Sequence, residues 1–189
     1  QAITGSVSEA IRLGCSAVGS TIYPGSDAAL DVITEIQEIA LEAKDAGLAV
    51  VVWSYPRGGD IRQEGETAID IVSYAAHMAA LVGAHIIKVK PPTSFIELDE
   101  AKKVYMSENI PIETLKDRIK HVVQSCFNGK RLVVFSGGSS RNKEDLLQEI
   151  KELYLGGASG SIVGRNSFQR PFDEAIHLLN QITNVYRGK

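Results

Sequence analysis

The stretch "HIIKVKPPT", residues 85–93, is the most informative about the fold. It has the apolar composition of a buried strand but carries two lysines, Lys88 and Lys90. Successive strand residues point to opposite faces, so Lys88 and Lys90 share one face and Ile87 and Val89 share the other. A buried lysine loses its hydration, which is costly unless the charge is paired or removed. We therefore expect a strand with one face against helices and one face in a polar interior.

Four other apolar runs resemble this strand, and helical patterns separate all five. The expected strands are residues 16–23, 48–55, 84–90, 131–137 and 160–166, and the expected helices are 7–13, 27–46, 66–82, 112–127, 143–155 and 172–186. A longer polar loop is expected over 91–110. This alternation predicts one α/β domain, residues 1–189, with parallel strands. An open doubly wound sheet and part of a (β/α)8 TIM barrel both fit it.

Composition narrows the classes of protein that fit the chain. Its 189 residues are 44% hydrophobic, enough for one core, and carry a net charge of −3 without a basic tract, so nucleic acid is a poor candidate partner. Cys15 and Cys126 are too few for a disulfide framework. No apolar run reaches about 18 residues and no secretory signal is visible. We expect a soluble, cytoplasmic protein without a membrane partner.

Polar residues and glycines collect where the expected strands end, which is where α/β folds bind ligands. Trp53 and Tyr55 share a strand face, and Tyr55 could transfer a proton there, although a packed aromatic pair would give the same pattern. Arg57 could hold a phosphate with two hydrogen bonds, or it is an ordinary loop arginine.

Glycines follow the last two expected strands. Gly137 and Gly138 follow one strand, and Gly164 and Arg165 close the next. Glycine lets backbone N–H groups approach an anion, and barrels often bind phosphate after their last two strands. Either pair alone is weak evidence, but the two in consecutive units predict a phosphate site.

The two lysines suggest covalent chemistry. Strand rise separates their Cα atoms by about 7 Å. Mutual repulsion and desolvation both favour an uncharged amine, which can attack a carbonyl and form a Schiff base. Lys90 lies nearer the carboxyl end and is the predicted nucleophile, with Lys88 as a deeper charge that tunes it. The alternatives are a lysine paired with a carboxylate and a lysine that binds phosphate directly.

No pattern predicts a metal or a cofactor. The histidines lack the spacing with carboxylates that metal sites show, and no Ser-His-Asp set, dinucleotide fingerprint or P-loop is present.

Five motifs together carry a family resemblance. They are "GCSAVGSTIYPGS" (14–26), "VVWSYPRGG" (51–59), "AHIIKVKPPT" (84–93), "VVFSGG" (133–138) and "IVGRNSFQRP" (162–171). In this order they resemble the archaeal-type class I fructose-bisphosphate aldolase family, and its bacterial branch most closely. The resemblance implies a metal-independent TIM barrel. It would cleave fructose 1,6-bisphosphate reversibly to dihydroxyacetone phosphate and glyceraldehyde 3-phosphate, in glycolysis and gluconeogenesis.

The resemblance also implies roles for single residues. The Schiff-base lysine of the family's K-x-K strand falls on Lys90 and its acid/base tyrosine on Tyr55. Substrate contacts fall on Trp53 and Arg57. Apart from the resemblance, we expect Lys88 either to bind substrate or to tune Lys90. The phosphate-binding segments fall on Ser136, Gly137, Gly138, Gly164 and Arg165.

One departure from the family is large. The family has eight strands, and this chain supplies what we expect to be the last five; the strand with the D-H-G motif and the catalytic aspartate has no counterpart in it. Five strands at barrel tilt cannot close. We therefore expect three β/α units before Gln1, and we expect residues 1–189 alone to be neither stable nor active. The resemblance also implies a homo-oligomer of barrels, with a decamer as one candidate.

Three other functions stay open. The first is a related Schiff-base aldolase, transaldolase or thiolase that acts on another phosphorylated ketose. The second is a non-catalytic sugar-phosphate binding protein on a barrel. The third is a five-stranded open-sheet binding domain.

Overall fold

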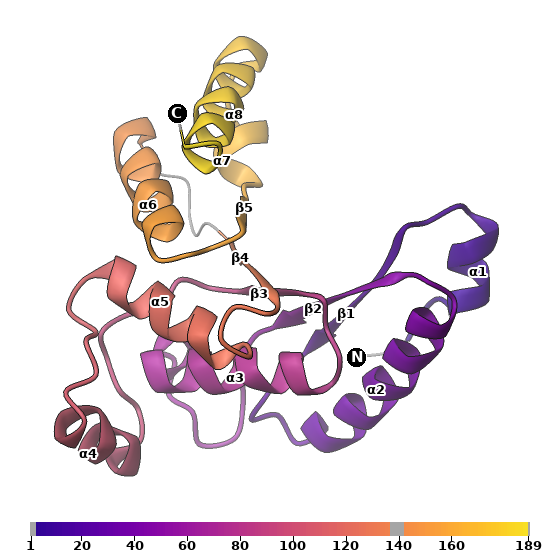
Figure 1. Cartoon of the computed structure of the whole chain (residues 1–189), viewed down its shortest axis with the longest axis horizontal. Helices are drawn as coiled ribbons and strands as arrows, with labels where there is room; N and C mark the ends of the chain where they lie inside the picture. Colours follow the sequence, from indigo (N-terminus) through magenta and orange to yellow (C-terminus); the bar gives the residue numbers. More distant parts are fainter. Residues whose placement is uncertain (1–2, 137–141, 189) are drawn as a thin grey trace.

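The computed structural model describes residues 3–136 and 142–188, and a single five-stranded parallel sheet forms its centre (Figure 1). The strands pair in chain order from β1 to β5. Their bounds are β1 Ala17–Ile22, β2 Ala49–Ser54, β3 Ile86–Val89, β4 Leu132–Ser136 and β5 Gly160–Ile162. The predicted alternation of parallel strands and helices is confirmed.

Helices connect the strands and cover one side of the sheet. They are α1 Val7–Arg12, α2 Ala29–Asp45, the 3-10 helix η1 Gly65–Thr67, α3 Ile69–Leu81, α4 Asp99–Ser107, α5 Leu115–Ser125, α6 Lys143–Leu155, α7 Arg165–Phe168 and α8 Phe172–Tyr186. Figure 1 shows α2, α3 and α5 along one side of β1 to β3, and α6 and α8 beside β5. Within the described ranges, no helix has the length and apolar character needed to cross a membrane.

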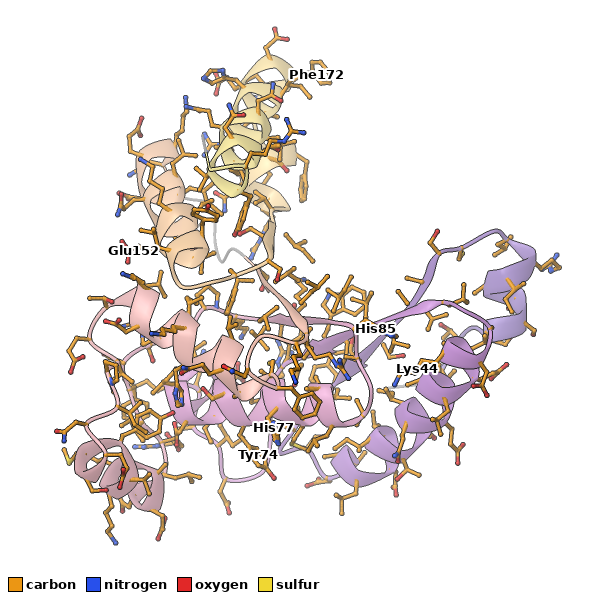
Figure 2. All side chains as sticks on the ribbon, viewed as in Figure 1. Lys44, Tyr74, His77, His85, Glu152 and Phe172 are labelled. Atoms are coloured by element: carbon orange, nitrogen blue, oxygen red, sulfur yellow. The ribbon has the colours of Figure 1, made fainter. Side chains whose placement is uncertain are left out.

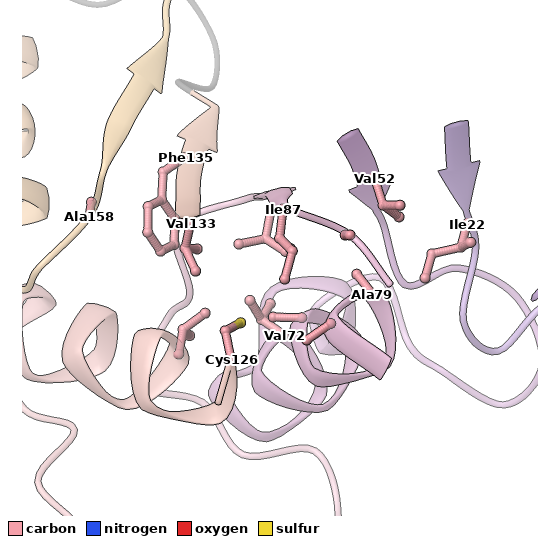
Figure 3. Packing of buried hydrophobic residues seen from close by; sticks show 14 of the residues in the cluster. Ile22, Val52, Val72, Ala79, Ile87, Cys126, Val133, Phe135 and Ala158 are labelled. Carbon is pink, nitrogen blue, oxygen red and sulfur yellow. The ribbon is translucent and has the colours of Figure 1, made fainter. Parts of the chain in front are cut away.

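The core lies between this layer of helices and the sheet. Figure 3 shows Ile22, Val52, Ile87 and Val133, from four different strands, on the side of the sheet that faces the helices. Each is at most 1% exposed. Burying an aliphatic side chain of this size contributes roughly 1.5–3 kcal/mol. Val89 is buried with them, which confirms the predicted face for Ile87 and Val89.

The opposite face of the sheet is much less covered. Trp53 and Lys88 project from it and are only partly buried. Apolar side chains on the same face are more exposed still, with Leu132 at 52% and Ile162 at 43%. The strand alternation therefore divides the sheet into a packed face and an open face, and the predicted site residues lie on the open one.

The prediction of a plain loop over 91–110 was wrong, because α4 lies within it. Two contacts with distant residues hold this helix. The carboxylate of Asp70, on α3, accepts hydrogen bonds from the backbone N–H groups of Glu97 and Leu98, each at 3.0 Å. The Tyr105 hydroxyl lies 2.7 Å from Nε2 of His121, on α5. Neither contact leaves a periodic signal in the segment itself.

The last strand is shorter than predicted. Gly164 and Arg165 do not close β5: Gly164 precedes the short helix α7, and Arg165 is its first residue. The turn forms because the carbonyl of Gly164 accepts the backbone N–H groups of Ser167 and Phe168. The glycine and the arginine still follow β5 directly, at the carboxyl edge of the sheet.

Candidate active site

The open face places Lys88 between two aromatic rings. Strand register pairs Trp53 on β2 with Lys88 on β3. The Nζ atom of Lys88 lies 5.9 Å from the centroid of a Trp53 ring and 5.6 Å from the centroid of the Tyr55 ring. Among the described residues, no carboxylate lies within ion-pair distance of this amine. The amine is therefore available to a ligand that enters from the open face.

Trp53 can adopt this position because the neighbouring strand has a glycine there. A Cβ atom built on Gly19 of β1 would lie 2.4 Å from Cζ3 and 2.8 Å from Cη2 of the indole. Real Cβ atoms essentially never approach so closely, so any larger residue would displace the ring. Sequence reasoning missed Gly19, although a glycine inside a strand is a known sign of close approach by a neighbour.

Lys90 has a partner that Lys88 lacks. Its Nζ atom donates a hydrogen bond to Oε2 of Glu66 at 3.2 Å, and the pair is partly buried, with side-chain exposures of 36% and 26%. Sequence reasoning missed Glu66, which lies 24 positions before Lys90. The structure thus separates the two lysines: Lys88 faces aromatic rings, whereas Lys90 forms an ion pair, one of the alternatives left open by the sequence.

The two loops around this ion pair are joined to one another. Arg62 donates two hydrogen bonds to the Glu97 carboxylate, at 3.1 and 3.0 Å. This contact raises the pKa of Arg62 and lowers the pKa of Glu97 through the shared hydrogen bonds and opposite charges. The backbone N–H groups of Thr93 and Ile69 donate across the same junction, to the carbonyls of Thr67 and Phe95. The loop after β2 and the loop after β3 therefore form one unit.

Arg57 lies at the same edge of the sheet. Its backbone N–H donates to the carbonyl of Pro24 at 3.0 Å, and its guanidinium carbon lies 5.6 Å from the centroid of the Tyr23 ring. The side chain is exposed. The structure joins Arg57 to the loop after β1 and leaves its phosphate role a prediction.

The phosphate residues are placed only in part. Ser136 ends β4, and its hydroxyl donates to the carbonyl of Val89 on β3 at 3.5 Å, a long hydrogen bond. Gly164 and Arg165 follow β5, which pairs with β4. Gly137 and Gly138 lie outside the described residues. The described part of this segment thus brings Ser136 next to the lysine strand.

One open hollow of about 370 Å³ lies between α1, β1 and α2 and is lined in part by Gly19. Another of about 400 Å³ lies at the amino edge of β2 to β4, where Lys44 and His85 are found (Figure 2), and a third of about 630 Å³ lies between α4 and the segments on either side of it. Lys88 and Lys90 line none of these three. We place the site on the open face because the reactive side chains converge there. Within the ranges that the structure describes, no three His, Cys, Asp or Glu side chains are grouped so that they could hold a metal ion.

Comparison with known proteins identifies the class of protein. The model of the DeoC/LacD family of aldolases matches residues 3–170, and the chain belongs to that family. Among curated relatives, it is 34% identical over 194 residues to a probable class 1 fructose-bisphosphate aldolase of Chlamydia muridarum. It is 38% identical over 186 residues to a class 1 fructose-bisphosphate aldolase of Thermoproteus tenax. The alignments cover 95% and 97% of this chain, but only 54% and 60% of those relatives.

Solved structures agree with these relatives. An archaeal fructose 1,6-bisphosphate aldolase superposes with a TM-score of 0.79 at 33% identity, over 100% of this chain and 64% of that one. A second archaeal structure has its catalytic lysine covalently bound to the carbinolamine intermediate of the substrate; its TM-score is 0.76 at 33% identity, over 96% of this chain and 62% of that one. The chain therefore has the fold of part of a (β/α)8 barrel, which excludes the open doubly wound sheet.

Proposed function

We propose that this chain is the C-terminal five β/α units of a TIM barrel that acts as a class I fructose-bisphosphate aldolase. The barrel would cleave fructose 1,6-bisphosphate reversibly through a Schiff base, without a metal. The relatives that match almost the whole chain carry this activity in their names. The observation that carries the proposal is the Lys88 amine beside Tyr55 and Trp53 on the open face, with no carboxylate of the described residues within ion-pair distance.

We propose Lys88, rather than Lys90, as the lysine that forms the imine. The assignment to Lys90 rested on its position nearer the carboxyl end of the strand and on the family's K-x-K strand. The contacts favour the reverse, because an ammonium held by a carboxylate has no free lone pair, and Lys90 is held by Glu66. Lys88 also faces the tyrosine expected to transfer the proton. In this scheme the two lysines exchange the roles that the sequence suggested.

The reaction then follows from these positions. The Lys88 amine attacks C2 of the open-chain ketose, and loss of water gives a protonated iminium. Tyr55 acts as the general base that removes the proton of the C4 hydroxyl. The electron pair of the C3–C4 bond forms the C2=C3 bond as the iminium π electrons move to nitrogen. Glyceraldehyde 3-phosphate leaves, and an enamine remains. Protonation at C3 and hydrolysis release dihydroxyacetone phosphate and the free lysine.

The other site residues would hold the substrate with its C2 carbonyl next to the Lys88 amine. Trp53 borders the amine and excludes water from one side. One phosphate would be bound by backbone N–H groups and side chains at the ends of β4 and β5. These belong to Ser136, Gly137, Gly138, Gly164 and Arg165. Arg57 would contact the other end of the substrate. The expected upstream units would add the catalytic aspartate.

The cellular setting belongs to the same proposal. We infer that the enzyme works in the cytoplasm, in glycolysis and gluconeogenesis, as a homo-oligomer of barrels. The family resemblance supports this setting. The exposed Phe168 and Phe172, 71% and 77% accessible, are consistent with burial against further parts of such an assembly.

Borohydride reduction in the presence of substrate tests the proposal on the full-length protein. The reagent reduces the imine to a stable secondary amine, which mass spectrometry locates on a peptide. We expect a dihydroxyacetone phosphate adduct on Lys88 and none in Lys88→Arg. An adduct on Lys90 would overturn the lysine assignment, and no adduct at all would overturn the Schiff-base proposal. A panel of phosphorylated ketoses would then separate this reaction from those of related Schiff-base enzymes.

A further inference from the structure

Two lysines on one strand face create a problem of selectivity for an imine-forming enzyme. Lys88 and Lys90 are two residues apart, so their Cα atoms are separated by about 7 Å. Both side chains extend into the open face and both are only partly buried. A ketose that binds at this face therefore meets amines from two neighbouring positions of the chain. Something in the site must therefore decide which amine reacts.

We infer that Glu66 is a positioning residue that keeps Lys90 out of the covalent step, so that the imine forms at Lys88 alone. The inference rests on the proposed Schiff-base function and deepens it. The Glu66 carboxylate lies 3.2 Å from Nζ of Lys90 and engages it as an ammonium. An ammonium must lose its proton before it can attack a carbonyl, and the carboxylate opposes that loss.

Glu66 is held in place by more than its own contact. It lies in η1, where its backbone N–H donates to the carbonyl of Arg62 at 3.2 Å. Arg62 in turn forms the bidentate ion pair with Glu97 on the loop after β3. The Glu97 side chain passes so close to Gly65 that a Cβ atom there would lie 2.7 Å from its Cδ. The residue before Glu66 is thus packed under the ion pair that joins the loops.

The same junction fixes the chain after Lys90. Thr93 donates to the carbonyl of Thr67 from its backbone N–H at 2.8 Å and from its hydroxyl at 3.1 Å. Asp70, only 8% exposed, holds the backbone of Glu97 and Leu98. Because these hydrogen bonds join the loop that carries Glu66 to the loop that follows Lys90, the fold sets the distance between the carboxylate and the Lys90 amine.

The chemistry of the two lysines differs accordingly. At either lysine, the neutral amine adds to the ketone and loss of water forms the C=N bond. At Lys90, the amine must in addition leave its hydrogen bond to Glu66 before it can reach the ketone. A charged hydrogen bond of this kind is strong enough to reduce the reaction at Lys90 by a factor of about ten or more.

Glu66→Gln in the full-length protein tests the inference, with Glu64→Gln as the matched control. Both substitutions remove one negative charge from the same turn, but Glu64 is exposed and lies outside the site. Each protein is reduced with borohydride in the presence of fructose 1,6-bisphosphate, and mass spectrometry measures the ratio of Lys90 to Lys88 adduct. We expect Glu66→Gln to raise this ratio at least about tenfold. Wild type and Glu64→Gln should carry the adduct on Lys88 alone.

Rescue by a conservative variant adds a readout that a purely structural role would not give. Glu66→Asp keeps the charge on a shorter side chain and should restore most of the selectivity. Glu66→Ala, which also removes the carboxylate, replaces Glu66→Gln if that variant does not fold. An adduct on Lys88 alone in the variant that lacks the carboxylate would overturn this inference and leave the aldolase proposal intact. No adduct in the wild type would overturn both.

Discussion

Gly19→Ala tests how far the site depends on the position of one indole ring. The new Cβ atom would lie 2.4 Å from Cζ3 and 2.8 Å from Cη2 of Trp53. Carbon atoms in contact are separated by about 3.5–4.0 Å, so the ring must move by roughly 1 Å or more. Overpacking of this kind costs about 1–3 kcal/mol of folding stability. The displaced ring lies against Lys88, so the substitution should also disturb the reactive amine.

The expected effect on catalysis is larger than the effect on folding. A displacement of about 1 Å in a catalytic group can lower the rate by about 10²-fold. We therefore expect kcat/KM of the full-length enzyme to fall about 10- to 100-fold, with the protein still folded in far-UV circular dichroism. The assay is fructose 1,6-bisphosphate cleavage coupled to detection of glyceraldehyde 3-phosphate. Urea denaturation of the same samples measures the change in stability.

A matched control and a double substitution test whether the contact between Gly19 and Trp53 causes the loss of activity. Gly160→Ala on β5 adds the same methyl group to a strand, but the new Cβ atom would lie at an ordinary 3.6 Å from its nearest neighbour, Cγ1 of Val134. It should leave kcat/KM within about twofold of the wild type. Trp53→Phe should lose activity by itself but should make Gly19→Ala less harmful, because the smaller ring leaves space. Equal kcat/KM for Gly19→Ala and Gly160→Ala would show that the contact does not position Trp53.

Three further predictions concern the scaffold around the site. Phe135→Ala, at a side chain that is 0% exposed, should lower the free energy of unfolding by about 3–5 kcal/mol in urea denaturation. Asp70→Ala should leave two backbone N–H groups unpaired, destabilise the protein by at least about 1–3 kcal/mol, and speed hydrogen exchange at Glu97 and Leu98. Burial lowers the pKa of His121, and burial with the charges of Lys44 and Arg131 lowers that of His85. The contribution of both histidines to the free energy of unfolding is therefore fully present above about pH 6.5, and it should be lost as the pH falls below that value. Equal urea midpoints at pH 5 and pH 7.5 would contradict this.

Local geometry explains why much of the fold could be predicted from the sequence. The strand period of two residues assigned Ile87 and Val89 to the core and both lysines to the open face before any contact was known. The helices 143–155 and 172–186 were predicted with the bounds that α6 and α8 have. The helix α4 was missed because its support comes from Asp70 and His121 on other helices.

What the sequence by itself determined is the order of strands and helices, the face to which each strand residue points, and the family. Only the tertiary structure distinguished Lys88 from Lys90, because it brought Glu66 to one amine and two aromatic rings to the other. It also showed that Gly19 leaves the space that Trp53 occupies. Side-chain direction follows from backbone geometry within a few residues, whereas the partner of a side chain depends on how distant segments pack together.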